Sequence, residues 1–243
     1  MPRRPGWYIE AMVAVSHLLP ARIDHTLLRP EAGRDEILAL ADEAARYGLA
    51  AVVVLPRWVT LVRRRLEGTG VATCSVVGFP LAHELPATLA AAARALTGAG
   101  AQEIDMVIST GALRSGETGW VAEEVAAVAT AGREGAPSLL LKVIVEIHLL
   151  DDARLAQACR LIAEGGADFV KTTTGFTGGG ATPEETGRLR RLASPALRVK
   201  ASAGIRTLEQ ALALVAAGAD RLGTSAGASI ARAWEEERDA HPL

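Results

Sequence analysis

The sequence predicts an α/β chain that folds as one (β/α)8 TIM barrel, and three observations lead to that class. Short runs rich in β-branched residues alternate with longer amphipathic stretches rich in Ala, Leu, Glu and Arg. Runs such as 51–55 are apolar at successive positions, which is typical of parallel strands buried on both faces. No polar linker divides the 243 residues, and this length is common for a single barrel.

The predicted strands are short and bounded by glycine or polar residues. In chain order they are expected at 22–25, 51–55, 72–78, 103–108, 139–147, 167–171, 197–200 and 220–222. A helix follows each strand, which predicts parallel pairing and a closed barrel rather than an open sheet.

The predicted helices carry recognisable start and stop signals. They are expected at 34–47, 56–67, 86–97, 120–132, 151–164, 183–192, 207–217 and 226–237. Thr182 with Pro183, and Thr207 with Glu209, are typical N-terminal sequences. Glycines stand where C-terminal caps are expected, at Gly48, Gly98, Gly165 and Gly218.

The first 20 residues lie outside these units. We expect residues 1–20 to form a short N-terminal extension, helical and packed under the barrel, and residues 21–243 to form the barrel domain. The apolar stretch near the start is short and lacks a convincing cleavage site, and no apolar run reaches the length of a membrane span. The sequence therefore predicts a cytoplasmic protein.

The charge balance and the cysteines exclude several kinds of partner. The formal net charge is −2 and the isoelectric point is about 6.2, so neither nucleic acid nor an anionic membrane is expected as a partner. Cys74 lies in an apolar run and Cys159 in a helical pattern, which favours packing over a disulfide or metal ligation.

Lysine is rare in this chain. Of 26 basic residues, only Lys142, Lys171 and Lys200 are lysines. Arginine keeps its proton at any working pH, so it cannot supply a free amine. A position that keeps lysine against this bias is a candidate for chemistry that needs an amine, although a few lysines also survive by chance.

Three candidate residues are expected to meet at the barrel mouth. Lys171 and Lys200 end consecutive predicted strands, and Asp105 lies late in the fourth. Two ammonium groups close together in an apolar mouth lower one pKa, which releases an amine that attacks carbonyl carbons. Asp105 would then move protons through a water as general acid and base. Two simple salt bridges are the alternative.

Small residues follow the last three predicted strands and indicate a phosphate site. Barrels commonly bind phosphate with the loops after strands seven and eight and a helix N-terminus. Glycine also marks plain turns, and Arg206 could instead pair with a helix residue. The candidate phosphate-binding residues are Gly175, Ala203, Gly204, Arg206, Gly223 and Ser225.

The histidines and Lys142 are given structural roles. No histidine has a partner at metal-ligand spacing, so no metal is expected, and alternation sends His25 and Asp24 to opposite sides of their strand. Lys142 opens the fifth predicted strand and is expected more than about 10 Å below the mouth, from a rise of about 3.3 Å per residue. It is interpreted as part of an ion pair at the barrel floor or in the interior, and tuning of the site is the alternative.

The chain resembles the deoxyribose-phosphate aldolase family from the first strand to the eighth. The stretches that carry the resemblance are 23–28, 76–81, 103–108, 142–146, 166–176, 199–206 and 221–225, and the run that ends in Lys171 is close to diagnostic.

The resemblance implies a class I aldolase on a (β/α)8 barrel that needs no cofactor. It implies reversible cleavage of 2-deoxy-D-ribose 5-phosphate to D-glyceraldehyde 3-phosphate and acetaldehyde. By the same resemblance Lys171 forms the Schiff base, Lys200 lowers its pKa, and Asp105 is the acid and base. Asp24 and Thr26 match a supporting pair on strand one, and a homodimer or homotetramer is common in the family.

Three positions depart from the family pattern. Val53 stands where a cysteine is frequent, and Ile147 where threonine is usual. Ala203 replaces the first of two glycines, and its N–H is expected to serve a phosphate only if its φ stays negative.

Three alternatives stay open from the sequence alone. A transaldolase or another Schiff-base lyase would use the same lysine on a different sugar phosphate. A catalytically silent barrel would bind a sugar phosphate as a sensor. A metal-dependent barrel lyase would lose activity on chelation.

Overall fold

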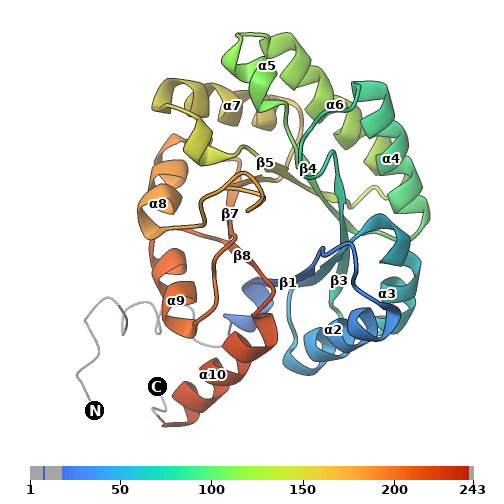
Figure 1. Cartoon of the computed structure of the whole chain (residues 1–243), viewed down its shortest axis with the longest axis vertical. Helices are drawn as coiled ribbons and strands as arrows, with labels where there is room; N and C mark the ends of the chain where they lie inside the picture. Colours follow the sequence, from blue (N-terminus) through green and yellow to red (C-terminus); the bar gives the residue numbers. More distant parts are fainter. Residues whose placement is uncertain (1–7, 9–17, 241–243) are drawn as a thin grey trace.

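The computed structural model describes Tyr8 and residues 18–240, and these form a closed barrel of eight parallel strands inside a ring of helices (Figure 1). The strands pair in sequence order and β8 closes on β1. They are β1 Ile23–Leu27, β2 Ala51–Val54, β3 Ala72–Val77, β4 Glu103–Val107, β5 Leu140–Ile144, β6 Phe169–Lys171, β7 Arg198–Ser202 and β8 Arg221–Thr224. The predicted (β/α)8 fold is confirmed.

The helices follow the strands as predicted. The α-helices are α2 Arg34–Tyr47, α3 Val59–Arg65, α4 Pro86–Gly98, α5 Thr110–Arg114, α6 Thr118–Gly135, α7 Asp152–Glu164, α8 Pro183–Leu192, α9 Leu208–Ala216 and α10 Gly227–Ala240. Short 3₁₀ turns are η1 Pro20–Arg22, η2 Pro56–Trp58 and η3 Ile147–Leu149. The prediction omitted α5, a single turn between β4 and α6.

The helix ends show why these segments stop where they do. Thr182 and Thr207 accept hydrogen bonds from backbone N–H groups in the first turns of α8 and α9. Gly48 ends α2 in the left-handed region, at φ 61°, where a side chain would be strained.

Two apolar layers hold the helices against the outside of the barrel. One lies under α4 to α8 and includes Ile104, Val143 and Val170. The other lies under α2, α3, α9 and α10 and includes Ile37 and Trp234. Successive strand residues therefore face this outer layer and the barrel interior in turn, which fixes the set of side chains that point inward.

The N-terminal prediction is only partly covered by the structure. Tyr8 is helical and buried within the layer that also contains Trp234. The remainder of the predicted helix lies outside the described residues, and the boundary at residue 20 stays a prediction. Within the described part of the chain, no helix is both long and apolar enough to span a membrane.

Candidate active site

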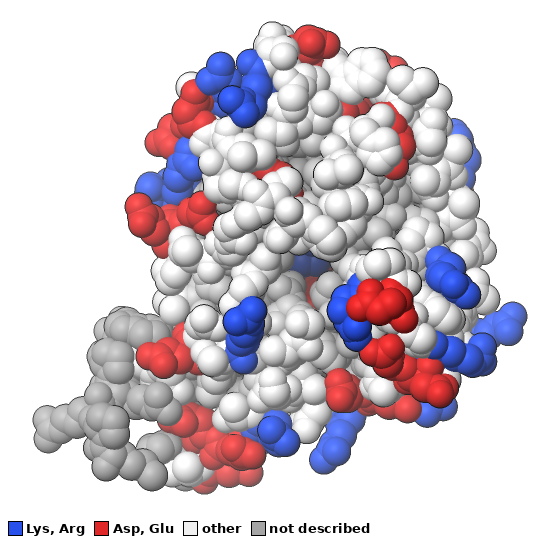
Figure 2. All heavy atoms as spheres, in the orientation of Figure 1, with Lys and Arg blue, Asp and Glu red and all other residues white. Residues whose placement is uncertain are grey.

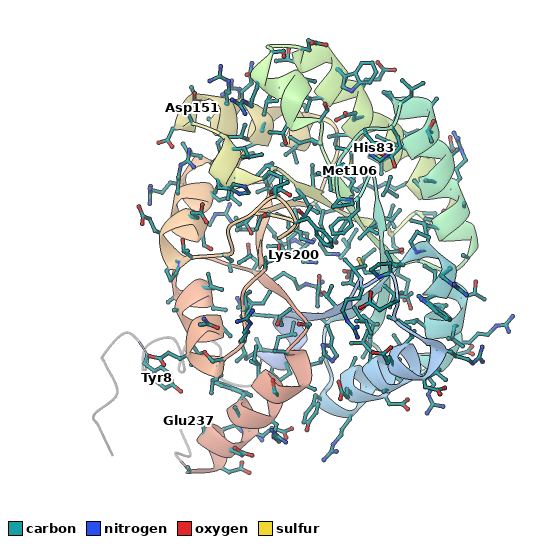
Figure 3. All side chains as sticks on the ribbon, in the orientation of Figure 1. Tyr8, His83, Met106, Asp151, Lys200 and Glu237 are labelled. Atoms are coloured by element: carbon teal, nitrogen blue, oxygen red, sulfur yellow. The ribbon has the colours of Figure 1, made fainter. Side chains whose placement is uncertain are left out.

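The barrel interior is apolar on one side and charged on the other. Ala51, Val53, Cys74 and Val76 of β2 and β3 form a small apolar cluster inside the barrel. The remaining strands turn acidic and basic side chains inward, and Figure 3 shows Lys200 at the centre of the ring. Buried charges are rare unless they are paired, so this half of the interior marks a candidate site.

Asp105 is the centre of this charged cluster. One carboxylate oxygen, Oδ2, accepts hydrogen bonds from Lys171 Nζ and Lys200 Nζ, both at 2.7 Å. The other oxygen, Oδ1, lies 3.0 Å from Lys142 Nζ. Asp24 Oδ2 also accepts from Lys200 Nζ, at 2.5 Å. The structure therefore brings together the acid and the two amines that the sequence placed at one point.

Lys142 does not lie at the barrel floor, away from the mouth, so that prediction was wrong. β5 begins at Leu140 and ends at Ile144, which puts Lys142 mid-strand and in register with Asp105. Its ammonium group reaches Asp105 and also lies 2.6 Å from Glu103 Oε2. The interpretation as an interior ion pair is correct, but the pair belongs to the candidate site.

Glu103 and Arg221 complete the cluster from below. Arg221 donates to Asp24 Oδ1 at 2.8 Å and to Glu103 Oε1 at 3.0 Å. Its guanidinium group also lies 5.8 Å from the centre of the Phe169 ring. The signal for Glu103 was present in the sequence, because it stands two residues before Asp105 and so faces the same side of the strand.

The environment lowers the pKa of Lys171 and raises the pKa of its two neighbours. Burial, together with Lys200, outweighs the effect of Asp105 and lowers the pKa of Lys171 below its ordinary value. Burial also acts on Lys142 and Lys200, but the facing carboxylates raise the pKa of both. The same lysines hold the pKa of Asp105 well below its usual range.

The charges in the cluster balance when Lys171 is neutral. Asp24, Glu103 and Asp105 carry negative charge, and Lys142, Lys200 and Arg221 carry positive charge. A proton on Lys171 would leave one uncompensated positive charge in a buried site, which is costly. The geometry thus favours a free amine on Lys171 and permanent charges on its neighbours.

A pocket of about 330 Å³ opens above Lys171 at the barrel mouth. Figure 2 shows the hollow near the centre of this face, with basic atoms at its bottom. Most of the predicted phosphate-binding residues line it, namely Ala203, Gly204, Arg206, Gly223 and Ser225. Gly175 is not among the lining residues, although its neighbours Thr174 and Phe176 are.

Thr26 and Arg206 both line the pocket, but they differ in how their side chains are bonded. Thr26 donates to the carbonyl oxygen of Asp24 at 3.0 Å and lines the wall near the cluster. Arg206 bonds to Gln210 only through its backbone N–H, and its guanidinium group pairs with no residue in the described part of the chain. It is therefore not used by a helix residue, which was the alternative considered from the sequence.

Several residues outside the pocket have structural roles. His25 points away from the barrel interior and its Nε2 lies 2.8 Å from a carboxylate oxygen of Glu43, as the alternation predicted. Cys74 and Cys159 are free and buried. Ile147 is fully buried in the apolar layer under α4 to α8, which accounts for an apolar residue where the family usually has threonine.

Ala203 adopts a left-handed backbone conformation, with φ at 73°. The condition of a negative φ is therefore not met. The loop is held in this shape because the carbonyl of Ala203 accepts a hydrogen bond from the N–H of Ala181, at 2.9 Å, in the loop after β6. Left-handed alanine is strained by its Cβ, so the family's glycine would fit this position with less strain.

An Ala203→Gly variant is expected to be more stable than the parent by about 0.5–1 kcal/mol. Relief of about 1–2 kcal/mol of left-handed strain exceeds the entropy that glycine adds to the unfolded chain. Urea unfolding would measure the change. Ala201→Gly is the matched control, because Ala201 is buried within β7 and should lose stability. A fall in the stability of Ala203→Gly would contradict the expectation.

The fold and the site define a (β/α)8 barrel enzyme with a buried lysine at the floor of its pocket. Residues 21–234 match the sequence model of a family described as "DeoC/LacD family aldolase". This match covers most of the chain, and the chain belongs to the DeoC/LacD aldolase family.

Individual relatives agree with this assignment. The chain is 51% identical over 212 residues to the deoxyribose-phosphate aldolase of Rhodospirillum rubrum, which covers 87% of each protein. It is 44% identical over 208 residues to that of Geobacillus sp. (strain WCH70), covering 86% of this chain and 92% of the relative. The tetrameric deoxyribose phosphate aldolase of Aeropyrum pernix superposes with a TM-score of 0.87 at 32% identity, over 97% of this chain and 100% of the other.

Proposed function

We propose that this aldolase cleaves 2-deoxy-D-ribose 5-phosphate reversibly to D-glyceraldehyde 3-phosphate and acetaldehyde through a Schiff base on Lys171. The observation that carries the proposal is the position of Lys171. Its amine is at the floor of the pocket, its pKa is lowered, and it lies 2.7 Å from Asp105. The family membership supports the same reaction.

In the first step the neutral amine of Lys171 attacks the aldehyde carbon of the open-chain sugar. The carbinolamine that forms loses water and gives an iminium ion. The positive charge of the iminium lies beside Asp105, whose carboxylate Lys142 and Lys200 help to hold ionised. This arrangement stabilises the charge at the moment it appears, without reorganising water.

In the second step the bond between C2 and C3 of the sugar breaks. Its electron pair moves to the iminium and gives an enamine, while the hydroxyl on C3 loses its proton and becomes the aldehyde of glyceraldehyde 3-phosphate. Asp105 alone is a weak base because its pKa is so low. We assign the acceptance of this proton to a water that hydrogen-bonds to Asp105, and the donation of a proton in the later step at carbon to Lys200, which is protonated. Protonation of the enamine at carbon and hydrolysis then release acetaldehyde and free Lys171.

The phosphate is assigned to the pocket wall formed by the loops after β7 and β8. Gly204 offers a backbone N–H group in the loop after β7, Gly223 lines the same wall from the end of β8, and Ser225 adds a hydroxyl. Gly175 is assigned to the same site through the loop that carries Thr174. Arg206 supplies the positive charge.

An Arg206→Gln variant is expected to raise KM for the sugar phosphate about tenfold. A hydrogen bond to a charged group contributes about 1.5–3 kcal/mol, and the effect should lie at the low end of this range because the Arg206 side chain is exposed to solvent. Steady-state kinetics would measure it. Unphosphorylated 2-deoxyribose is the control substrate, because its KM should not change. An equal effect on both substrates would contradict a phosphate contact.

Borohydride trapping tests the proposed reaction directly. The protein is incubated with 2-deoxyribose 5-phosphate and borohydride, which reduces an iminium to a stable amine, and the adduct is located by peptide mass spectrometry. We expect an adduct on Lys171 that is absent in Lys171→Leu and that survives chelation of metals. No adduct with the sugar phosphate still bound would favour a sensor. An adduct on Lys200 would reverse the roles assigned to Lys171 and Lys200.

We further propose a cytoplasmic homo-oligomer, either a dimer or a tetramer. The tetrameric relative supports the assembly, and two buried free thiols suit a reducing compartment. Light scattering should return a multiple of 25.4 kDa, and a mass of 25.4 kDa would refute the assembly.

A further inference from the structure

Glu146 is a buried acid that the proposed chemistry does not use. It follows β5, at the mouth end of the barrel, and its side chain is 3% exposed. Its backbone is left-handed, with φ at 49° and ψ at 62°. Glutamate rarely adopts this strained conformation, and such strain persists only where other contacts hold it.

Three hydrogen bonds from the loop after β6 hold Glu146, and His148 Nδ1 also lies 3.8 Å from its Oε2. Its Oε2 accepts from the hydroxyls of Thr173 and Thr177, each at 2.6 Å, and its Oε1 accepts from the backbone N–H of Thr174 at 2.9 Å. Bonds to an ionised carboxylate are about twice as strong as neutral ones. These three donors also hold the pKa of Glu146 below its ordinary value, against the effect of burial.

The same loop connects the reactive lysine to the pocket. It begins directly after Lys171, and its residues Thr174 and Phe176 line the pocket wall. Thr173 links Glu146 to the next part of the loop, because its hydroxyl donates to Glu146 and also accepts from the N–H of Gly175 at 3.1 Å. The far side of the loop rests on β7, where Ser202 donates to the carbonyl of Thr173 at 2.6 Å.

We propose that Glu146 is a positioning residue for substrate binding, which fixes the segment 173–177 so that its backbone and side chains form one wall of the sugar-phosphate pocket. The inference rests on the proposed function for the identity of the substrate. Within the described residues, the hydrogen bonds of the Glu146 carboxylate go to Thr173, Thr174 and Thr177, and none goes to Lys171 or its charged neighbours, so its effect is on binding rather than on the amine.

Three variants separate positioning from stability. Glu146→Gln keeps the shape but removes the charge that holds three donors. Glu146→Gly also removes the contacts, but it relieves the left-handed strain at this position. Glu124→Gln is the matched control. Glu124 is a buried acid in α6 that accepts from the N–H of Ser109, in the loop after β4, and from the indole of Trp120 in its own helix, and neither partner lines the pocket.

The experiment measures kcat and KM for 2-deoxyribose 5-phosphate and the pH dependence of borohydride trapping with acetaldehyde. We expect KM to rise about tenfold in Glu146→Gln and Glu146→Gly, and kcat to stay within about threefold, since loss of binding-wall geometry removes uniform binding. The pH dependence of trapping should not move, and Glu124→Gln should keep the parent KM.

An unchanged KM in the Glu146 variants would overturn the proposal, as would an equal rise in Glu124→Gln or a shifted pH dependence. If neither Glu146 variant folds, Thr177→Val and Thr177→Ser test the proposal instead. Valine removes one of the three hydrogen bonds to Glu146, and serine keeps it. KM should rise in Thr177→Val alone. Turnover by the parent protein tests the reaction separately: no turnover there would refute the proposed function, whatever Glu146 does.

Discussion

A Lys171→Leu variant is expected to lose turnover by at least about 10⁴-fold, because the proposed covalent intermediate needs this amine. Lys142 and Lys200 cannot replace it, since the facing carboxylates raise the pKa of both and keep them protonated. The measurement is cleavage of 2-deoxyribose 5-phosphate at saturating substrate. Retention of more than a few per cent of the parent rate would contradict the assignment.

The same variant is expected to fold normally. The charges in the cluster balance without a proton on Lys171, so leucine removes a desolvated amine and leaves no charge unpaired. We expect the free energy of unfolding to change by less than about 1 kcal/mol. Urea unfolding would check this, and a large loss of stability would mean that Lys171 is charged in the free protein.

An Asp105→Asn variant is expected to lose both activity and stability. Breaking a buried ion pair on one side costs about 3–5 kcal/mol, and here three amines lose their common partner. Loss of the positioned acid and base should lower kcat by about 10²–10⁴-fold. Thermal unfolding and steady-state kinetics would measure the two effects. Asp42→Asn is the control, because that carboxylate forms an exposed pair with Arg65 and should matter little.

The pH dependence of Asp105→Asn gives a second readout with a definite sign. Asp105 favours the charged form of Lys171, so its removal lowers the pKa of that lysine further. The acid limb of iminium formation should therefore move to lower pH, although the overall rate falls. A shift to higher pH would show that Asp105 does not act on Lys171.

The fold and the meeting of Asp105, Lys171 and Lys200 were predictable because they depend on local patterns. Alternation of strands and helices gives the barrel, and the position of Asp105, Lys171 and Lys200 near strand ends places them at one mouth. The proposed amine chemistry is inferred from the residue types. These inferences need only the chain direction and the side-chain period, and both are visible in the sequence.

The depth of Lys142 and the backbone conformation of Ala203 were not predicted, because both depend on contacts with neighbouring strands and loops. Lys142 was placed too low because the predicted fifth strand ran to residue 147, whereas the left-handed turn at Glu146 ends the extended segment earlier. Register against β4 then brings Lys142 level with Asp105. The positive φ of Ala203 depends on its bond to Ala181, a contact between two loops that no local pattern reveals.

The charged cluster also bears on how the chain folds. Lys200 and Asp24 are 176 positions apart in the sequence, and Arg221 and Asp24 are 197 apart. A half-barrel that contained only the first strands would bury the carboxylates of Asp24 and Glu103 without their cations, which is unfavourable. Partly folded states that lack β7 and β8 are therefore higher in free energy than the complete barrel. We expect the barrel to form in one cooperative transition, slowed by these distant contacts, rather than by assembly of two independently stable halves.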